Sequence, residues 1–86
     1  MSETYSDARR RLHIQLAALG WKVSKPSLKI LWAEKRMPTG IYRLWFKSQA
    51  VYLDEHSLAV DIRGMSALEL QDHVSRMIEI RHQGSF

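Results

Sequence analysis

With 86 residues, 45% of them hydrophobic, and a formal net charge of +4, the chain suffices for one small folded domain and leaves little room for a second core. It has no cysteine, which excludes disulfides, thiolate catalysis and cysteine-based zinc sites and favours a reducing, cytoplasmic setting. Residues 1–47 hold ten Lys or Arg against three Asp or Glu, whereas residues 48–86 hold three against six, so one basic surface is expected if folding keeps the basic residues together.

The first predicted element is a helix from Ser6 or Asp7 to Leu19. Both residues at its start are good N-caps, and Gly20 follows the last apolar residue as a stop. A buried stripe at helical spacing is expected, made of Tyr5, Ala8, Leu12, Leu16 and Leu19. Residues 21–25 then lead out in an extended conformation until a proline interrupts them.

Alternating apolar and polar residues predict the strands that follow. The predicted strands are Leu28–Glu34, Ile41–Lys47, Ala50–Asp54 and Leu58–Arg63, with a turn over Lys35–Gly40. In the first strand, Leu28, Ile30 and Trp32 share one face, and Lys29, Leu31 and Ala33 share the other. In the last strand, Leu58, Val60 and Ile62 are expected to face the core. Two arrangements stay open at Ser48-Gln49, which either connects two strands tightly or bends one long strand.

The second helix has the clearest start signal in the chain. Ser66-Ala67-Leu68-Glu69 matches a capping box, and Met65 with Leu70 matches the hydrophobic staple that accompanies it. The apolar face continues to about His82, and Gly84 ends the helix.

The predicted fold is α+β, a two-layer sandwich in the order α-β-β-β(-β)-α, with both helices on one face of an antiparallel sheet. Residues 1–86 form a single domain in this interpretation, with frayed ends at 1–5 and 83–86. The start of the chain is polar and acidic, so no secretory signal is expected, and no apolar run is long enough to cross a membrane.

The segment Ile41–Lys47 is the most informative for function because its two faces differ in chemistry. Tyr42, Leu44 and Phe46 fall on one side of an extended strand, and Ile41, Arg43, Trp45 and Lys47 fall on the other. Since the apolar set is expected to enter the core, a row of Arg, Trp and Lys is left to face solvent or an anionic, stackable partner.

A catalytic interpretation finds little support. The four histidines lack metal-ligand spacing, and no glycine-rich phosphate loop is present. Asp54-Glu55-His56-Ser57 combines an acid, an imidazole and a hydroxyl, but hairpin turns collect such residues for structural reasons. We therefore expect no enzyme, no metal and no cofactor.

The leading hypothesis is a small non-enzymatic accessory protein that binds DNA or RNA by neutralising the backbone and stacking bases. The predicted binding residues are Arg43, Trp45 and Lys47, with Lys29 and Tyr52 as neighbours and Arg9, Arg10 and Arg11 as extra phosphate contacts. Further cations that could widen the basic footprint are Lys22, Lys25, Lys35 and Arg36. The alternative is a protein-interaction module, either a homodimer or an inhibitor or adaptor with an acidic partner; an ordinary solvated sheet face is the third possibility.

The order of elements, with Ala18-Leu19-Gly20-Trp21 after the first helix, resembles the double-stranded-RNA-binding fold and the small toxins of the HicA type. The toxins' strand Gly-Ser-His is absent, since no histidine lies between His13 and His56. The lysine-rich start of the RNA-binding family's last helix is also absent, because Ser66–Asp72 carries acids and no base. The resemblance therefore implies the fold alone, without either family's functional residues.

Overall fold

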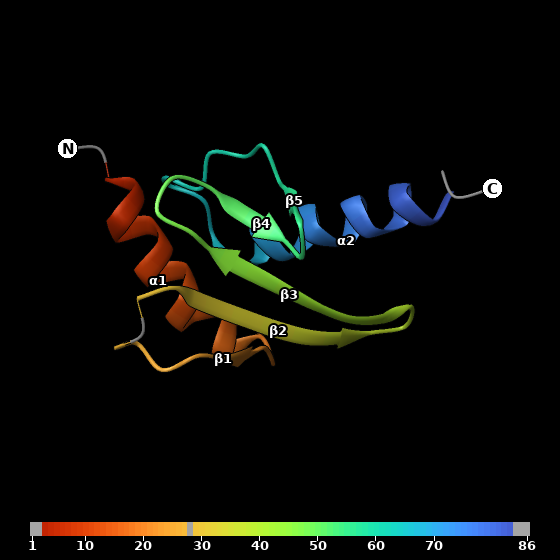
Figure 1. The fold of residues 1–86 in the computed structure, drawn as a ribbon, viewed down its shortest axis with the longest axis horizontal. Coiled ribbons are helices and arrows are strands. Elements are labelled where there is room, and N and C mark those ends of the chain that lie inside the picture. The colour runs from red at the N-terminus through yellow and green to blue at the C-terminus, as the bar shows by residue number, and fades with distance from the viewer. Residues whose placement is uncertain (1–2, 28, 84–86) are drawn as a thin grey trace.

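A computed structural model describes residues 3–27 and 29–83 of the chain (Figure 1). Within these residues the elements are α1 (Tyr5–Ala18), β1 (Lys22–Val23), β2 (Leu31–Met37), β3 (Gly40–Phe46), β4 (Val51–Leu53), β5 (His56–Ser57) and α2 (Ala67–Gln83). The strands form one antiparallel sheet in the order β1-β2-β3-β4-β5. Figure 1 shows the sheet in front and both helices behind it, so the predicted α+β sandwich is confirmed.

The core lies between the helices and the sheet face that they cover, which we call the inner face. Leu44 and Phe46 on β3 are fully buried there, as the alternation of Ile41–Lys47 predicts. The helices contribute the predicted apolar stripes, of which the fully buried members are Ala8, Leu12, Leu16, Leu70 and Val74. Ile41 is exposed and Trp45 is partly exposed, which places them on the opposite, outer face.

The second strand is shifted relative to its prediction. β2 begins at Leu31 and continues to Met37, because it pairs with β3 along its whole length. The predicted seven-residue strand from 28 is therefore wrong at both ends, and residue 28 lies outside the described part. The turn predicted over Lys35–Gly40 shrinks to the two residues between Met37 and Gly40. Leu31 and Ala33 face the core, so the Trp32 side chain points to the outer face.

The fourth predicted strand is also displaced. Only His56–Ser57 pair with β4, and residues 58–63 form no strand. Ala59 has a φ of 51°, a left-handed conformation that ends an extended strand. Leu58 and Ile62 are nevertheless buried, as predicted, and Val60 packs partly against the core. β3 ends at Phe46 and β4 begins at Val51, so the connection at Ser48-Gln49 separates two strands.

The helix ends are fixed by side-chain caps. Thr4, rather than Ser6 or Asp7, is the N-cap of α1, and its Oγ1 accepts the Asp7 N–H at 3.1 Å. Gly20 follows the α1 C-cap with a φ of 91°, as predicted. The capping box of α2 is confirmed, because Glu69 N–H donates to Ser66 Oγ and Ser66 N–H donates to Glu69 Oε1.

The structure describes only part of the two chain ends that are predicted to be frayed, residues 1–5 and 83–86. Residues 1–2 and 84–86, including Gly84, lie outside the described part of the chain. The Glu3 carboxylate accepts hydrogen bonds from Arg11 and from the Gly64 N–H, so residue 3 is held against both α1 and the loop before α2. These bonds hold the pKa of Glu3 at about 2, with the Arg11 bond as the largest cause. Neither helix of the described part has the length and apolarity that crossing a membrane requires.

Candidate functional site

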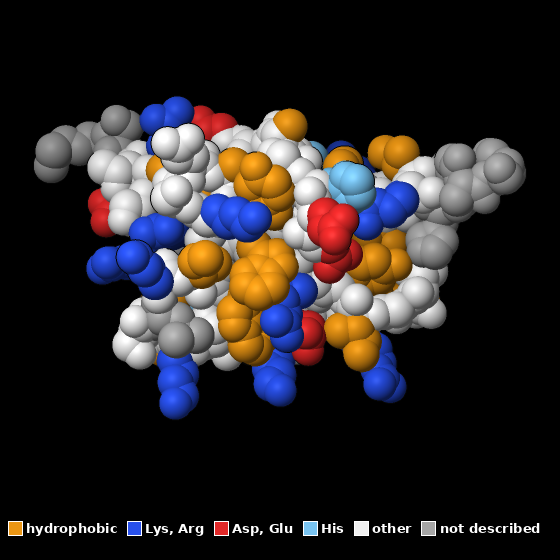
Figure 2. Space-filling view, in the orientation of Figure 1, with side chains coloured by type: hydrophobic (Ala, Val, Ile, Leu, Met, Phe, Trp, Pro, Cys, Tyr) orange, Lys and Arg blue, Asp and Glu red, His pale blue; other side chains and the backbone are white. Residues whose placement is uncertain are grey.

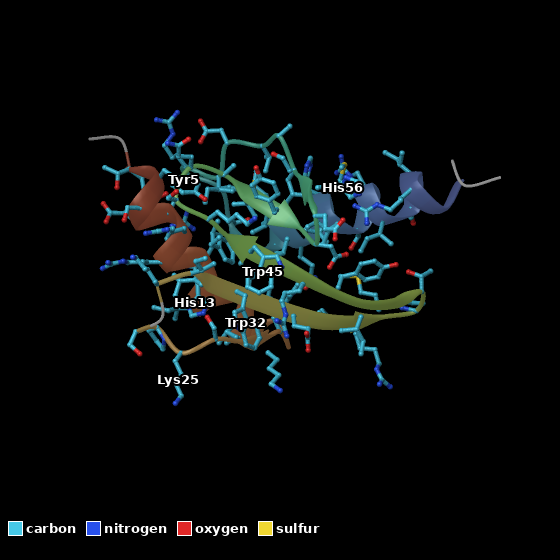
Figure 3. The ribbon with its side chains drawn as sticks, in the orientation of Figure 1. Tyr5, His13, Lys25, Trp32, Trp45 and His56 are labelled. Atoms are coloured by element: carbon cyan, nitrogen blue, oxygen red, sulfur yellow. The ribbon has the colours of Figure 1, made fainter. Side chains whose placement is uncertain are left out.

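Three aromatic side chains form a row across the outer face. Trp32 pairs with Trp45, and Trp45 pairs with Tyr52, so one residue from each of β2, β3 and β4 stands in line. Directly paired residues of antiparallel strands lie on the same face with their Cβ atoms about 4.5–5.5 Å apart. Figure 2 shows this face with a hydrophobic patch at its centre, and Figure 3 shows Trp32 and Trp45 side by side there. The result is a continuous aromatic strip, partly exposed on all three strands.

A charged row runs beside the aromatic row. Strand pairing places Lys22 opposite Glu34, and Glu34 opposite Arg43. Arg43 Nε and Nη2 both donate to Glu34 Oε1, at 3.1 and 2.8 Å. Asp54 continues the row, since its Oδ1 accepts the Arg43 N–H and its own N–H donates to the Arg43 carbonyl. Positive and negative charges therefore alternate along this side of the aromatic strip.

Arg43 also stacks on the aromatic row. Its guanidinium carbon lies 4.3 Å from the Trp32 ring centroid and 5.2 Å from the Trp45 ring centroid. These distances are within the range of cation–π contacts. Glu34 holds the guanidinium in this position, so the contact of Arg43 with Trp32 and Trp45 is fixed by an ion pair that is itself only partly exposed.

Lys47 lies on the other side of the aromatic row. Its Nζ lies 4.3 Å from the Tyr52 ring centroid, and its side chain is exposed. No ion pair of residues 3–27 and 29–83 includes Lys47. Its backbone is anchored from both sides, because its N–H donates to the Ala50 carbonyl and its carbonyl accepts the Tyr5 hydroxyl at 2.6 Å. Lys47 thus offers a free ammonium group on a fixed segment of backbone.

We name these six residues, Trp32, Glu34, Arg43, Trp45, Lys47 and Tyr52, the outer platform. A buried polar contact supports it from beneath. The Trp32 N–H donates to Ser24 Oγ at 3.0 Å, and the same hydroxyl lies 3.0 Å from His13 Nε2. Both His13 and Ser24 are buried, and burial lowers the pKa of His13, which favours the neutral imidazole.

The predicted binding residues divide into two groups. Arg43, Trp45, Lys47 and Tyr52 come together on the outer platform. Lys29 does not lie on the sheet, because β2 starts two residues after it. Arg9, Arg10 and Arg11 stand on α1, which packs on the inner side, and Arg11 is paired with Glu3 at 2.7 Å.

Lys35 corrects the predicted basic footprint. It alternates onto the inner face of β2, where its Nζ donates to the Leu19 carbonyl and to Gln71 Oε1. Its charge therefore stabilises the end of α1 rather than the outer surface. Lys22 and Arg36 alternate to the outer side of their strands and are exposed.

The sequence interpretation missed Glu34 as a platform residue. Its position two residues after Trp32 puts it on the same face of β2. Only the pairing of β2 with β3 reveals that it lies opposite Arg43, and the sequence does not specify that register.

The turn Asp54–Ser57 serves the fold. Asp54 has a φ of 54°, which suits the first position of a two-residue hairpin turn between β4 and β5. Its carboxylate contacts the Arg43 backbone and lies 3.9 Å from Arg81 of α2. In the part of the chain that the structure describes, no group of three or more His, Asp or Glu side chains is placed to hold a metal ion.

Comparisons with known proteins identify no relative. No protein-family model matches the chain, and no curated protein or solved structure matches it either. Function is therefore argued from the outer platform alone.

Proposed function

We propose that the protein binds single-stranded DNA or RNA on the outer platform and acts without catalysis. The observation that carries the proposal is the row of Trp32, Trp45 and Tyr52 beside the unpaired Lys47. Every base has a flat π-face that stacks on an aromatic side chain, and a nearby cation neutralises the phosphate that follows. An open sheet with aromatic residues on its solvent face is a recurrent way of binding unpaired bases.

Single strands fit this surface better than duplexes. In a duplex, the faces of the bases are stacked on one another, so aromatic rings on a flat sheet cannot reach them. In the part of the chain that the structure describes, both helices lie on the inner side, so no helix protrudes from the outer platform to enter a groove (Figure 1). The proposal therefore includes a preference for unpaired strands.

A homodimer is the second candidate, and one observation favours it. Ile41 lies on the outer side of β3, in line with Arg43 and Trp45, and is 57% exposed. An exposed apolar side chain on the same sheet face as aromatic residues is typical of protein interfaces. Light scattering at two protein concentrations distinguishes the candidates: a monomer at both concentrations favours nucleic acid, and a salt-sensitive dimer indifferent to oligonucleotides favours the interface.

The test of the proposal is a titration of labelled 12-nucleotide strands, followed by fluorescence anisotropy. Each neutralised phosphate lowers the affinity for a single strand roughly 2.5-fold between 50 and 200 mM salt, so a fall of at least this size is expected from Lys47. Trp45→Ala is expected to weaken binding by about fivefold to a hundredfold, the range for losing one stacked base. Leu68→Ala is the matched control, because Leu68 is 63% exposed on α2, and its removal should leave binding unchanged.

Three results would contradict the proposal: no binding of any single strand, tighter binding of a duplex of the same length, or equal losses in the Trp45 and Leu68 variants. Each variant is also unfolded in urea, so that a loss of binding is assigned to the surface rather than to a loss of fold.

A further inference from the structure

The two sides of the aromatic row differ in charge. On one side, Arg43 stands between the carboxylates of Glu34 and Asp54. On the other side, Lys47 has no acidic partner among residues 3–27 and 29–83, and its neighbour Ala50 is uncharged. A nucleotide stacked on Trp45 has a charged backbone and a neutral base edge, so these two parts will be drawn to different sides.

Electrostatic interactions fix the orientation of a nucleotide that is stacked on Trp45. A phosphate beside Arg43 would also face the carboxylates of Glu34 and Asp54, which offset the attraction of Arg43. Lys22 opposite Glu34 and Arg81 at 3.9 Å from Asp54 compensate these carboxylates only in part, so this mixed row attracts a phosphate less than a cation without an acidic neighbour does. A phosphate beside Lys47 meets an exposed ammonium that contacts the Tyr52 ring and takes part in no ion pair of the described residues. The backbone is therefore directed to the Lys47 side, and the edge of the base is directed to Glu34 and Arg43.

We propose that Glu34 and Arg43 read the edge of the base stacked on Trp45, and that this pair selects bases with an exocyclic amino group over thymine and uracil. The inference rests on the proposed function and adds a specificity to it. Glu34 Oε1 accepts both hydrogen bonds from Arg43, and among the described residues Oε2 has no hydrogen-bond partner. An ionised carboxylate is an acceptor only, and the Glu34 side chain is partly exposed, so Oε2 is available to accept a hydrogen bond from a ligand.

The chemistry of the bases gives the direction of the preference. Adenine, cytosine and guanine each carry an amino group that can donate to Glu34 Oε2. The one ring N–H of thymine or uracil lies between two carbonyl oxygens, which a carboxylate repels. Arg43 supplies the complementary donor beside the carboxylate, so the pair offers one acceptor and one donor to the base.

The experiment compares oligomers of twelve deoxyadenosines, deoxycytidines or deoxythymidines at one salt concentration. The wild type is expected to bind the adenine and cytosine strands about fivefold more tightly than the thymine strand, the low end for one base contact. Glu34→Gln should abolish this difference, because the glutamine amide also donates and so accommodates a thymine carbonyl. Arg43→Lys is the second variant and should narrow the difference, since it removes the planar fork that holds Glu34.

Two controls separate base reading from charge. Lys47→Ala should weaken binding of all three strands by one common factor and lower the salt slope by about 0.7, the value for one phosphate on a single strand. Asp61→Asn removes an acidic charge that is also paired with an arginine, Arg63 at 2.8 Å, but in the loop between β5 and α2 rather than on the strands that carry the outer platform. The Asp61 variant should keep the wild-type preference.

The outcomes distinguish the two proposals. If none of the strands binds, the proposed function fails, and the specificity fails with it. If all three strands bind the wild type equally, or if Glu34→Gln raises all three affinities by the same factor, the base-reading role is overturned while nucleic-acid binding stands. A preference for thymine in the wild type would also overturn it.

Discussion

Ser24 joins the outer platform to the core, and its replacement by alanine tests how firmly Trp32 is held. The Ser24 hydroxyl accepts the Trp32 N–H and contacts His13 Nε2, each at 3.0 Å. The Ser24 N–H also donates to the Trp32 carbonyl at 2.9 Å, a bond that alanine retains. Ser24→Ala therefore removes two side-chain contacts and leaves the backbone pairing in place.

The loss of stability in Ser24→Ala follows from the two groups that it leaves without partners, the His13 ring and the Trp32 N–H. A buried donor or acceptor that loses its partner costs about 1–3 kcal/mol. His13 is almost fully buried, so the loss of its partner accounts for most of the destabilisation. The Trp32 N–H is only part-buried, so its loss costs an amount near the lower end of that range. We expect Ser24→Ala to lower the free energy of unfolding by about 2–4 kcal/mol, a large part of the total for a domain of this size.

Urea unfolding followed by tryptophan fluorescence measures the effect. With a denaturant slope of about 2 kcal/mol per molar, the midpoint should fall by about 1–2 M. Ser27→Ala is the matched control, because Ser27 is an exposed serine of the same connecting segment. A shift of the Ser24 variant no larger than that of the Ser27 variant would refute the reasoning, since the hydroxyl would then carry no structural role.

Two further predictions concern pH. Burial lowers the pKa of His13 below 6.5, so just below that pH the unfolded chain binds a proton that the folded chain does not. The free energy of unfolding of the wild type should therefore be constant above about pH 6.5 and fall below it by up to about 1.4 kcal/mol per pH unit. Urea titrations at several pH values should show this decline in the wild type and not in His13→Leu. The pKa of Glu3 lies at about 2, so the stabilisation from its bonds with Arg11 and Gly64 is present above about pH 4.5 and is lost as the pH falls towards 2. Acid unfolding, monitored by circular dichroism, should therefore start at a higher pH in Glu3→Gln than in the wild type. Identical unfolding curves for the two proteins would exclude this role of Glu3.

The sequence predicts the two faces of β3 because a single period of two is unambiguous there. Leu44 and Phe46 share one face of the strand, whereas the other face carries the cations Arg43 and Lys47, which are too costly to bury, so only the first face can enter the core. β2 is different, since Trp32 on one face and Leu31 with Ala33 on the other are all apolar. Its register and its face are decided by pairing with β3, a tertiary interaction that local pattern does not contain.

The polar residues of the inner side cannot be placed from the sequence for a similar reason. Lys35 is the first residue of the turn predicted over Lys35–Gly40, yet it lies on β2, partly buried, and donates to the Leu19 carbonyl across the inner face. His13 stands beside the apolar stripe of α1 in the sequence, a position that predicts a surface or partly buried side chain, but it is buried against Ser24. Each position depends on a partner at least eleven residues away in the chain, which no periodicity within one element reveals.

A structural role alone does not account for the outer platform. The inner face is already complete, since Leu44 and Phe46 are fully buried beneath the helices. Cross-strand aromatic pairs and exposed cation–π contacts each contribute about 0.2–1 kcal/mol, which explains why Trp32, Arg43 and Trp45 stack well. They do not explain why Arg43 is paired with a carboxylate while, among the described residues, Lys47 is in no ion pair. A stabilising ladder would favour an acidic partner for Lys47 as well as for Arg43. The division into a paired cation beside carboxylates and an unpaired cation beside neutral residues matches the two ends of a nucleotide, and on this asymmetry the proposal of base reading depends.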